Sequence, residues 1–394
     1  MKKYLLFIFL GILGLILILS LYYFLIRPHI GDSNNQIFKN KIGGTPSEIS
    51  FSKEDRVYVT DGGYPQGNTI ESRFTGFAIW EADSALKTIT PYSLDARPIQ
   101  VIENSDKIFI NNGSEANGKF IVMDNTTKKI DKTFELKYTG VSPYSFPYFS
   151  NFFEYNDQLF LVAGDVSNNS IPTFIYNKKN QKLEQTEIKT ENQSFFAIKY
   201  IGILKNKVYF FATDSTESRS RHLVLVDLET KKITNDFNLG DKALKGEVSV
   251  FDTEKNIIYV PTISYNGENN KEVSGSLLSI NTINGEMNEL KLPNEITEIS
   301  EMDFVKNRLV FSKQDILSGT IYVYDTSTQQ VVKKFKVGDS IANMKASPDQ
   351  SKLYVLTNIV KLGDSYPRIA TDPKLKVFVT TNFQKTGEIN VTQK

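Results

Sequence analysis

Cysteine is absent from the 394-residue chain. Its absence excludes disulfides, a catalytic thiol, thiolate-bound metals and a lipid attached through cysteine. A large domain without disulfides must be held together by its buried core. The pattern of apolar residues is therefore the main guide to the fold.

Histidine is nearly absent as well, with His29 and His222 as its two occurrences. His222 alternates with Val224 and Val226 in a predicted strand, where a lone histidine is more often structural than a base or a ligand. A Ser-His-Asp triad would have to use His222, and no nucleophile-elbow motif accompanies it. We therefore expect no catalytic residue, no metal and no cofactor, and we favour a protein that is not an enzyme.

An excess of charge of one sign is also missing, because 46 Lys and Arg residues face 45 Asp and Glu residues. The net charge is +1, and no basic stripe stands out. Proteins that bind nucleic acid usually carry such a stripe. We expect no nucleic-acid partner.

What the chain does contain is a polar residue followed by an apolar-aromatic-apolar triplet, and this pattern returns about every 50 residues, as in repeat proteins. The central residues of the copies are Tyr58, Phe109, Phe160, Tyr209, Tyr259, Val310 and Tyr354. Around residues 319–358, one unit contains four short strands separated by polar turns. Four-stranded units repeated radially form a β-propeller, so the sequence predicts an all-β, seven-bladed β-propeller. We expect the marker aromatics to fill the cores between neighbouring blades.

The segment from Ile321 to Asn358, IYVYDTSTQQVVKKFKVGDSIANMKASPDQSKLYVLTN, resembles the YVTN-type β-propeller repeat of bacterial surface proteins. That repeat couples an apolar strand and an Asp-Thr turn to a Ser-Pro-Asp-Gly hairpin. Gln350 stands where the repeat has its turn glycine. The resemblance implies a β-propeller at a cell surface, and the Cys-free composition rich in Lys, Asn and Ile is typical of Gram-positive surface proteins.

An uncharged apolar run from Tyr4 to Ile26 follows Lys2 and Lys3. At about 1.5 Å per residue the run can cross a hydrocarbon core of about 30 Å, and it exceeds the apolar region of a cleaved signal peptide. We predict a cytoplasmic tip and transmembrane signal-anchor at residues 1–26, a tether at residues 27–36 and an extracytoplasmic β-propeller at residues 37–394. A cleaved signal peptide is the alternative.

The connections between the second and third strands of the units are long and dissimilar, whereas the turns between the third and fourth strands are short and alike. In a propeller these two sets lie on opposite faces, here named the elaborated face and the short-turn face. Binding usually resides on variable loops. Aromatic residues of the elaborated face could stack on a sugar or a peptide, or could instead pack into the channel mouth. The candidate ligand contacts are Tyr64, Tyr144, Phe146, Tyr148, Phe195 and Tyr265.

We accordingly expect a binding or scaffold module for a protein or a cell-wall glycan. Two alternatives stay open: a lactonase-like hydrolase or lyase with carboxylates at the channel mouth, and a subunit of a membrane complex. The Lys-rich segment Ile37–Ile42 resembles an outer strand and predicts closure of the last blade by the N-terminus, with the elaborated face pointing away from the membrane. Gly387–Thr392 is the alternative outer strand.

Overall fold

The structure is a computed structural model. It describes residues 46–52, 55–66, 73–112, 118–138, 148–164, 170–190, 195–214, 220–240, 243–266, 271–274, 276–296, 298–313, 318–360 and 370–392. Among these residues, no helix is long and apolar enough to cross a membrane. The predicted span at residues 4–26 lies outside the described part of the chain.

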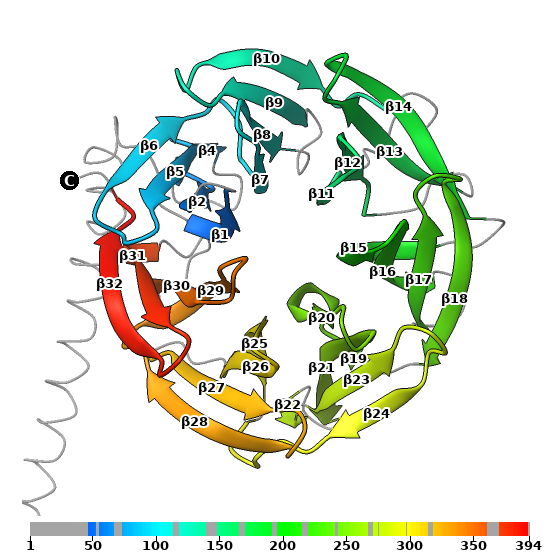
Figure 1. The fold of residues 1–394 in the computed structure, drawn as a ribbon, viewed down its shortest axis with the longest axis vertical. Coiled ribbons are helices and arrows are strands. Elements are labelled where there is room, and N and C mark those ends of the chain that lie inside the picture. Colours follow the sequence, from blue (N-terminus) through cyan, green and yellow to red (C-terminus); the bar gives the residue numbers. More distant parts are fainter. Residues whose placement is uncertain are drawn as a thin grey trace, which may run out of the picture.

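The strands form four-stranded antiparallel units arranged as a ring around a central channel (Figure 1). Each unit is named below by its innermost strand. The β1 unit contains β1 (Pro46–Phe51), β2 (Arg56–Asp61), β5 (Ala78–Asp83) and β6 (Ile89–Ser93). The β7 unit contains β7 (Gln100–Glu103), β8 (Lys107–Asn112), β9 (Lys119–Asp124) and β10 (Ile130–Glu135).

Two further units join edge to edge into one eight-stranded sheet, through a single parallel pairing of Lys189 with Lys232. The β11 unit contains β11 (Asn151–Tyr155), β12 (Gln158–Val162), β13 (Ser170–Asn177) and β14 (Lys182–Lys189). The β15 unit contains β15 (Phe195–Leu204), β16 (Lys207–Asp214), β17 (Arg221–Asp227) and β18 (Lys232–Gly240).

The remaining units complete the ring. The β20 unit contains β20 (Val250–Asp252), β21 (Ile257–Asn266), β23 (Leu277–Asn281) and β24 (Met287–Leu290). The β25 unit contains β25 (Ile299–Val305), β26 (Arg308–Lys313), β27 (Thr320–Asp325) and β28 (Gln330–Lys336). The β29 unit contains β29 (Ser340–Ala346), β30 (Lys352–Val360), β31 (Ala370–Val379) and β32 (Gln384–Asn390).

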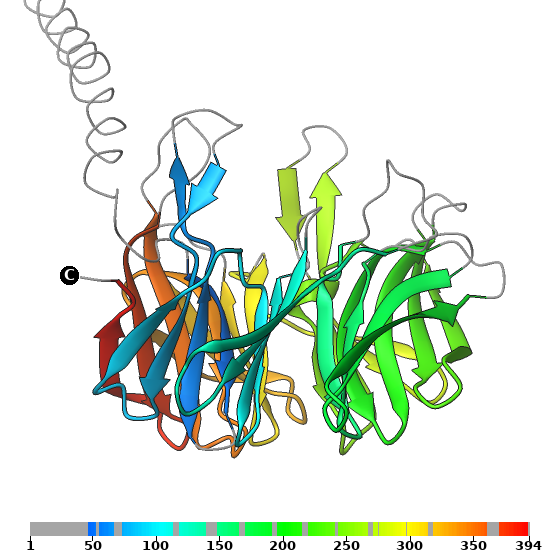
Figure 2. The same cartoon turned by 90° about the horizontal axis from the view of Figure 1, so that it is seen from above.

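Extra strands extend two of the connections that the sequence marked as long, and one connection between units. In the β1 unit, β3 (Tyr64–Gln66) and β4 (Arg73–Thr75) form a hairpin between the second and third strands. In the β20 unit, β22 (Lys271–Ser274) pairs with the end of β21, and β19 (Ala243–Leu244) pairs with the same strand. Figure 2 shows the β3–β4 hairpin and the β21–β22 ribbon rising from the same side of the ring. This side is the elaborated face.

The marker aromatics occupy the predicted places. Each lies on the second strand of its unit, is buried, and packs against the next unit around the ring. The ring of Phe109 lies 5.7 Å from that of Tyr176, and the ring of Tyr209 lies 4.9 Å from that of Phe251. Tyr354 of the last unit packs on Phe51 of the first, at 5.3 Å. The prediction of equivalent sites in the cores between blades is confirmed.

The short turns are alike because they share one local device. At the end of the third strand an Asp or Asn side chain accepts hydrogen bonds from backbone N–H groups two to five residues later, which fixes the turn. The residues concerned are Asp83, Asp124, Asn177, Asp227, Asn281 and Asp325. Gln350, in the turn between β29 and β30, has φ of 55°, and this explains why the related repeat places glycine there.

The last unit is closed by the C-terminal strand. β32 pairs with β31 as the outermost strand, so the prediction that residues 37–42 fill this position is wrong, and the alternative around Gly387–Thr392 is the one observed. The physical reason is that a short turn joins β31 to β32, so their pairing costs little loop entropy. Residues 37–42 lie outside the described residues.

The first and last units share no strand in the described chain and meet through side chains along what we call the seam. Ile49 N–H donates to Asn343 Oδ1 at 3.2 Å, and the Tyr354 hydroxyl donates to Ser84 O at 2.8 Å. Ile49, Trp80, Tyr354, Leu375 and other buried residues form one apolar cluster across it. Within the described residues, side-chain packing closes the ring.

Both ends of the described chain lie at the elaborated face. Pro46 is paired with Asp61, the last residue of β2, and Asn390 is paired with Lys374, just after the long β30–β31 connection. The sequence argument placed the entry of the chain on the short-turn face because it took the first strand to be an outer one. The first described strand is an inner one and runs the opposite way, so the described chain begins on the elaborated face and that argument loses its basis.

Candidate functional site: the central channel

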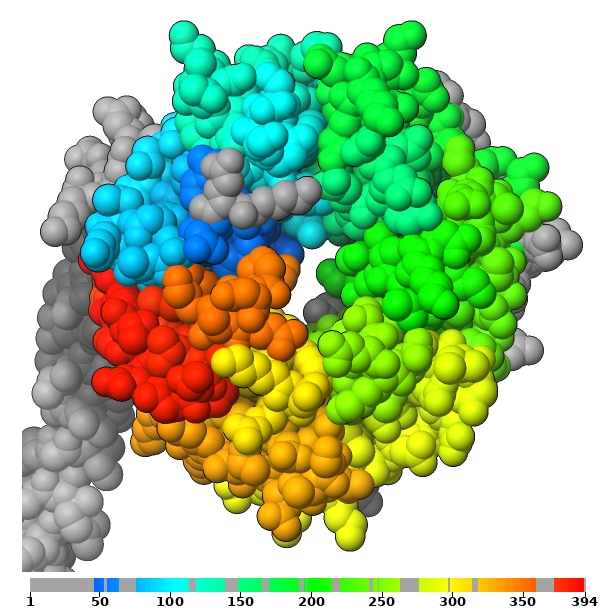
Figure 3. All heavy atoms as spheres, viewed as in Figure 1, coloured from blue at the N-terminus to red at the C-terminus, as the bar shows by residue number. Residues whose placement is uncertain are grey.

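The first strands of the units surround a cavity of about 590 Å³. Turn residues between the first and second strands, among them Thr253 and Pro348, line its outer end. These turns belong to the short-turn face, and Figure 3 shows the channel open in the middle of the ring. The described cavity is therefore reached from the face opposite to the elaborated loops.

Polar side chains stand at one level of the channel wall. Each lies on the first strand of its unit. Its partner on the second strand is the residue two positions after the central residue of the repeated triplet. We call this set the polar belt. Its members are Glu48, Gln100, Asn151, Lys199, Glu301 and Asn343.

Two members of the polar belt tie neighbouring units together. Asn151 Oδ1 accepts a hydrogen bond from Tyr200 N–H at 2.7 Å, and Asn343 Oδ1 accepts one from Ile49 N–H at 3.2 Å. The Asn151 amide also donates to Ile198 O at 3.1 Å. Because both asparagines bind the backbone of the next first strand, their role is structural.

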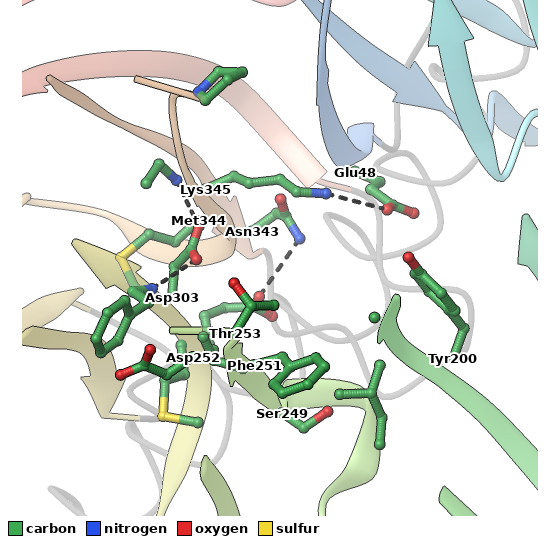
Figure 4. Close-up of a pocket in the computed structure, with 18 of the residues that line it drawn as sticks. Glu48, Tyr200, Ser249, Phe251, Asp252, Thr253, Asp303, Asn343, Met344 and Lys345 are labelled. Carbon is green, nitrogen blue, oxygen red and sulfur yellow. Dashed lines mark hydrogen bonds and ion pairs between the residues drawn. The ribbon is translucent and has the colours of Figure 1, made fainter. Parts of the chain in front are cut away.

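The charged members are distributed unevenly. Near the seam, Lys345 Nζ lies 3.9 Å from Glu48 Oε1, and Asn343 Nδ2 lies 3.5 Å from Glu301 Oε2 (Figure 4). Asp303 lies deeper and accepts a hydrogen bond from Ala346 N–H at 2.6 Å. Burial raises the pKa of Asp303, against the opposing effect of its backbone hydrogen bonds. Each of these carboxylates thus has a partner on another element.

The other side of the channel presents groups that the structure leaves unpaired. Within the described part of the chain, no hydrogen bond or ion pair involves the side chains of Lys199 or Gln100, and both are half-buried. Tyr200 stands beside Lys199, with its ring stacked on Phe153 at 4.8 Å. Figure 4 shows Tyr200 across the cavity from Asn343. A ligand in the channel would therefore find an ammonium group, an amide and a phenol on this wall.

The ionisation of Tyr200 makes the stability of the protein depend on pH at alkaline pH. Burial raises its pKa to about 12, so the phenol stays neutral at physiological pH and can donate a hydrogen bond. Because an unfolded tyrosine ionises near pH 10, the stabilisation from the neutral phenol is complete below about pH 10 and is lost as pH rises towards 12. We expect unfolding of the Tyr200→Phe variant to depend less steeply on pH in this window, by up to about 1.4 kcal/mol per pH unit. Urea unfolding at pH 9, 10.5 and 11.5 measures this, and equal slopes in both proteins would contradict it.

The aromatic residues proposed from the sequence are placed differently. Tyr64 belongs to β3, opposite Thr75, and Tyr265 belongs to β21, opposite Glu272. Tyr148 is 50% exposed, whereas Phe195 is 2% exposed, with its ring 5.4 Å from that of His222. Tyr144 and Phe146 lie outside the described residues. Exposed Tyr148 can meet a ligand, and Phe195 lies in the core.

The polar belt was missed by the sequence argument, which looked at loops. A signal did exist, because Asn151, Lys199 and Asn343 each interrupt or precede apolar residues shortly before a marker triplet. In a strand buried on both faces, a polar residue indicates either a hydrogen bond to a neighbour or a wall of the channel.

Comparison with known proteins identifies the fold. No protein-family model matches the chain, and no curated protein matches it. A solved structure, the Dos1 propeller, has 12% identity and a TM-score of 0.50, over 80% of this chain and 90% of that one. The fold is a β-propeller. At this identity the likeness says nothing about function.

Two other solved structures resemble the chain over most of its length. Hydrazine synthase from Kuenenia stuttgartiensis has 12% identity and a TM-score of 0.59, over 80% of this chain and 93% of that one. A hypothetical selenium-binding protein from Sulfolobus tokodaii has 12% identity and a TM-score of 0.57, over 89% of this chain and 93% of that one. The resemblance of residues 321–358 to the YVTN repeat stays a prediction, because no family model tests it.

Proposed function

We propose that the chain is a non-catalytic binding module that takes a polar ligand into its central channel. The observation that carries the proposal is the preformed cavity of about 590 Å³, with Lys199 and Gln100 on its wall and no protein partner for either side chain in the described residues. Ligand sites commonly have volumes of about 300–1,000 Å³ and a few well-placed polar groups. A carboxylate or phosphate-bearing ligand would satisfy Lys199.

The contacts that the channel carboxylates make within the protein favour binding over catalysis. A hydrolase or lyase would use a carboxylate at the channel as acid or base, in reach of substrate. Glu48 lies beside Lys345, Glu301 beside Asn343, and Asp303 accepts a backbone hydrogen bond. These contacts support a role in joining units near the seam. The hydrolase or lyase remains the second candidate function.

We also propose that the four-stranded units are the blades of a seven-bladed propeller of the YVTN type, held outside the cell membrane of a Gram-positive bacterium by residues 4–26. Since Pro46 and Asn390 are both at the elaborated face, that face would lie towards the membrane. The channel would then open away from the membrane, where a protein or a cell-wall glycan can reach it.

Photo-crosslinking tests the binding proposal. We would place p-benzoylphenylalanine at Thr253, which lines the outer end of the channel, and, as a control, at Lys205, an exposed lysine of the β15–β16 turn. Crosslinked products should form from position 253 in membranes and should be reduced at least tenfold in a Lys199→Ala or a Gln100→Ala background. Equal products from positions 253 and 205 would contradict a ligand in the channel.

Cysteine labelling tests the location and orientation. Because the chain lacks cysteine, Asp349→Cys on the short-turn face and Tyr148→Cys on the elaborated face each give a single reactive thiol. With a bulky membrane-impermeant maleimide on intact cells, both should label, and position 349 should label several-fold faster until detergent removes the membrane. Labelling of neither residue before lysis would contradict the extracytoplasmic location without affecting the binding proposal.

A further inference from the structure

The charged residues of the polar belt lie on opposite walls of the channel. Glu48 on β1 and Lys199 on β15 belong to first strands that face each other across the ring (Figure 1). Their partners on the second strands, Thr60 and Phe211, both lie two positions after the central residue of the triplet, so the two residues stand at the same level. Glu301 takes this level on β25, near the seam. The belt thus presents carboxylates on one wall and an ammonium group on the other.

A second lysine at this level is already engaged. In the β20 unit, Lys245 N–H donates to Pro261 O at 2.8 Å, and Pro261 is again two positions after the central residue of the triplet. The ammonium group of Lys245 contacts the Glu298 carboxylate and donates to Ile299 O at 3.1 Å, at the start of the next first strand. Lys245 therefore joins two units. In the described chain, Lys199 is the lysine of this level that is left for a ligand.

A simple anion does not match this cavity well. The lysines that line it are Lys199 and Lys345. The carboxylates that line it are those of Glu48, Asp252, Glu254, Glu301 and Asp303. Asp252 has Lys255 at 3.6 Å, and Asp303 accepts backbone hydrogen bonds, yet the other three carboxylates still outnumber the two lysines. An anion held at Lys199 would be attracted by one wall and repelled by the opposite one.

Glu48 is accessible to a cationic group even though Lys345 lies near it. The nearest charged atoms of the two side chains are 3.9 Å apart, which is beyond hydrogen-bond distance. The Lys345 side chain is 41% exposed and that of Glu48 is 32% exposed. A solvated pair of this geometry contributes little, and Lys345 can turn towards solvent. A ligand ammonium group at hydrogen-bond distance from Glu48 would replace a weak contact with a stronger one.

We infer that the channel binds a short peptide with both ends free, with its carboxylate at Lys199 and its ammonium group at Glu48. The inference rests on the proposed binding function and names the class of ligand. Each charged end then meets a group of opposite charge, and neither wall repels the ligand as a whole. Between the ends, the Gln100 amide and the Tyr200 phenol can form hydrogen bonds with the peptide groups.

Four forms of trialanine test the two charges separately: the free peptide, the N-acetylated peptide, the C-terminal amide and the peptide blocked at both ends. Their side chains are identical, so differences in affinity report the end charges. Isothermal titration calorimetry with the full chain in detergent should show the free peptide binding at least tenfold more tightly than each blocked form. The pH should be about 6.5, below the pKa of a terminal amine, about 7.7–8.0. The same four forms of dialanine and tetra-alanine cover other spans between the walls.

Variants of the two walls assign the ends of the peptide. Lys199→Met should bring the free peptide and its C-terminal amide within twofold of each other while the preference for a free amine remains. Glu48→Gln should have the reverse effect, removing the preference for a free amine alone. Because each variant keeps one preference, it also reports that the protein is folded. The exposed turn residues Lys205 and Glu229 supply matched controls, and Lys205→Met and Glu229→Gln should change neither preference.

Three results would overturn the inference. They are an N-acetylated peptide that binds as tightly as the free peptide at every length, no binding of any of these peptides at millimolar concentration, and preferences that are unchanged in both wall variants. None of them would remove the proposed function, because crosslinks from position 253 that depend on Lys199 would still show a ligand of another class in the channel. Loss of those crosslinks would contradict the binding function itself.

Discussion

Replacing Phe160 by alanine is expected to lower the free energy of unfolding by about 3–5 kcal/mol. The side chain is 2% exposed and stacks on Phe153 at 5.2 Å. It faces the next unit, where Phe210 packs against the same Phe153. Two rigid sheets cannot move together enough to refill the space, so the lost transfer free energy and the cavity add.

Urea unfolding measured by circular dichroism checks this prediction. Ile283→Ala is a suitable control, because Ile283 is 70% exposed in a turn and its truncation should cost less than about 0.5 kcal/mol. If Phe160→Ala lowered the free energy of unfolding by less than about 1 kcal/mol, the marker residues would not be the main source of stability in the cores between units.

Replacing Glu103 by alanine should lower the free energy of unfolding by about 3 kcal/mol. Its side chain is 1% exposed and lies 2.5 Å from the guanidinium of Arg56. Asn125 Nδ2 also donates to Glu103 Oε1 at 2.6 Å. Removal of the carboxylate leaves Arg56 with Glu81, at 3.3 Å, as a remaining charged partner. For this reason we expect the lower end of the range known for broken buried pairs.

A double-mutant cycle with Arg56→Met separates the pair from its surroundings. The double variant should be less destabilised than the sum of the single variants, because the uncompensated charge is gone. Glu388→Ala is the matched surface control: its pair with Lys385, at 2.8 Å, is exposed and should contribute less than about 1 kcal/mol. Equal losses for Glu103→Ala and Glu388→Ala would refute the distinction.

Much of the β-propeller could be predicted because its signals are local. An aromatic such as Phe109 or Tyr354 recurs where every unit needs a large side chain, and Asp124 or Asp227 recurs where every short turn needs an acceptor. In both cases a few neighbouring residues in the chain determine the contact. A period is therefore visible even where the units share little else.

The closure and the site depend on contacts that no short segment encodes. Residues 37–42 and the segment around Gly387 both have the alternation of an outer strand. The segment around Gly387 pairs with β31, to which a short turn connects it. Asn343 binds Ile49 across 294 positions of sequence. Likewise, His222 lies 2.7 Å from Asp236 of β18 and 4.0 Å from Asp214 of β16, contacts that its own strand pattern does not reveal.

The seam also has a consequence for how the molecule forms. Every other pair of neighbouring units is made of consecutive segments, whereas the seam joins residues 270 to 294 positions apart. Closing so long a loop is entropically costly and is rewarded only when both partners are already folded. A chain emerging from the ribosome would therefore complete its first unit long before the covering side chains of β29 and β30 exist. During that interval the face of Ile49 and Trp80 is exposed, which makes it the place where nascent chains would associate with one another or with a chaperone.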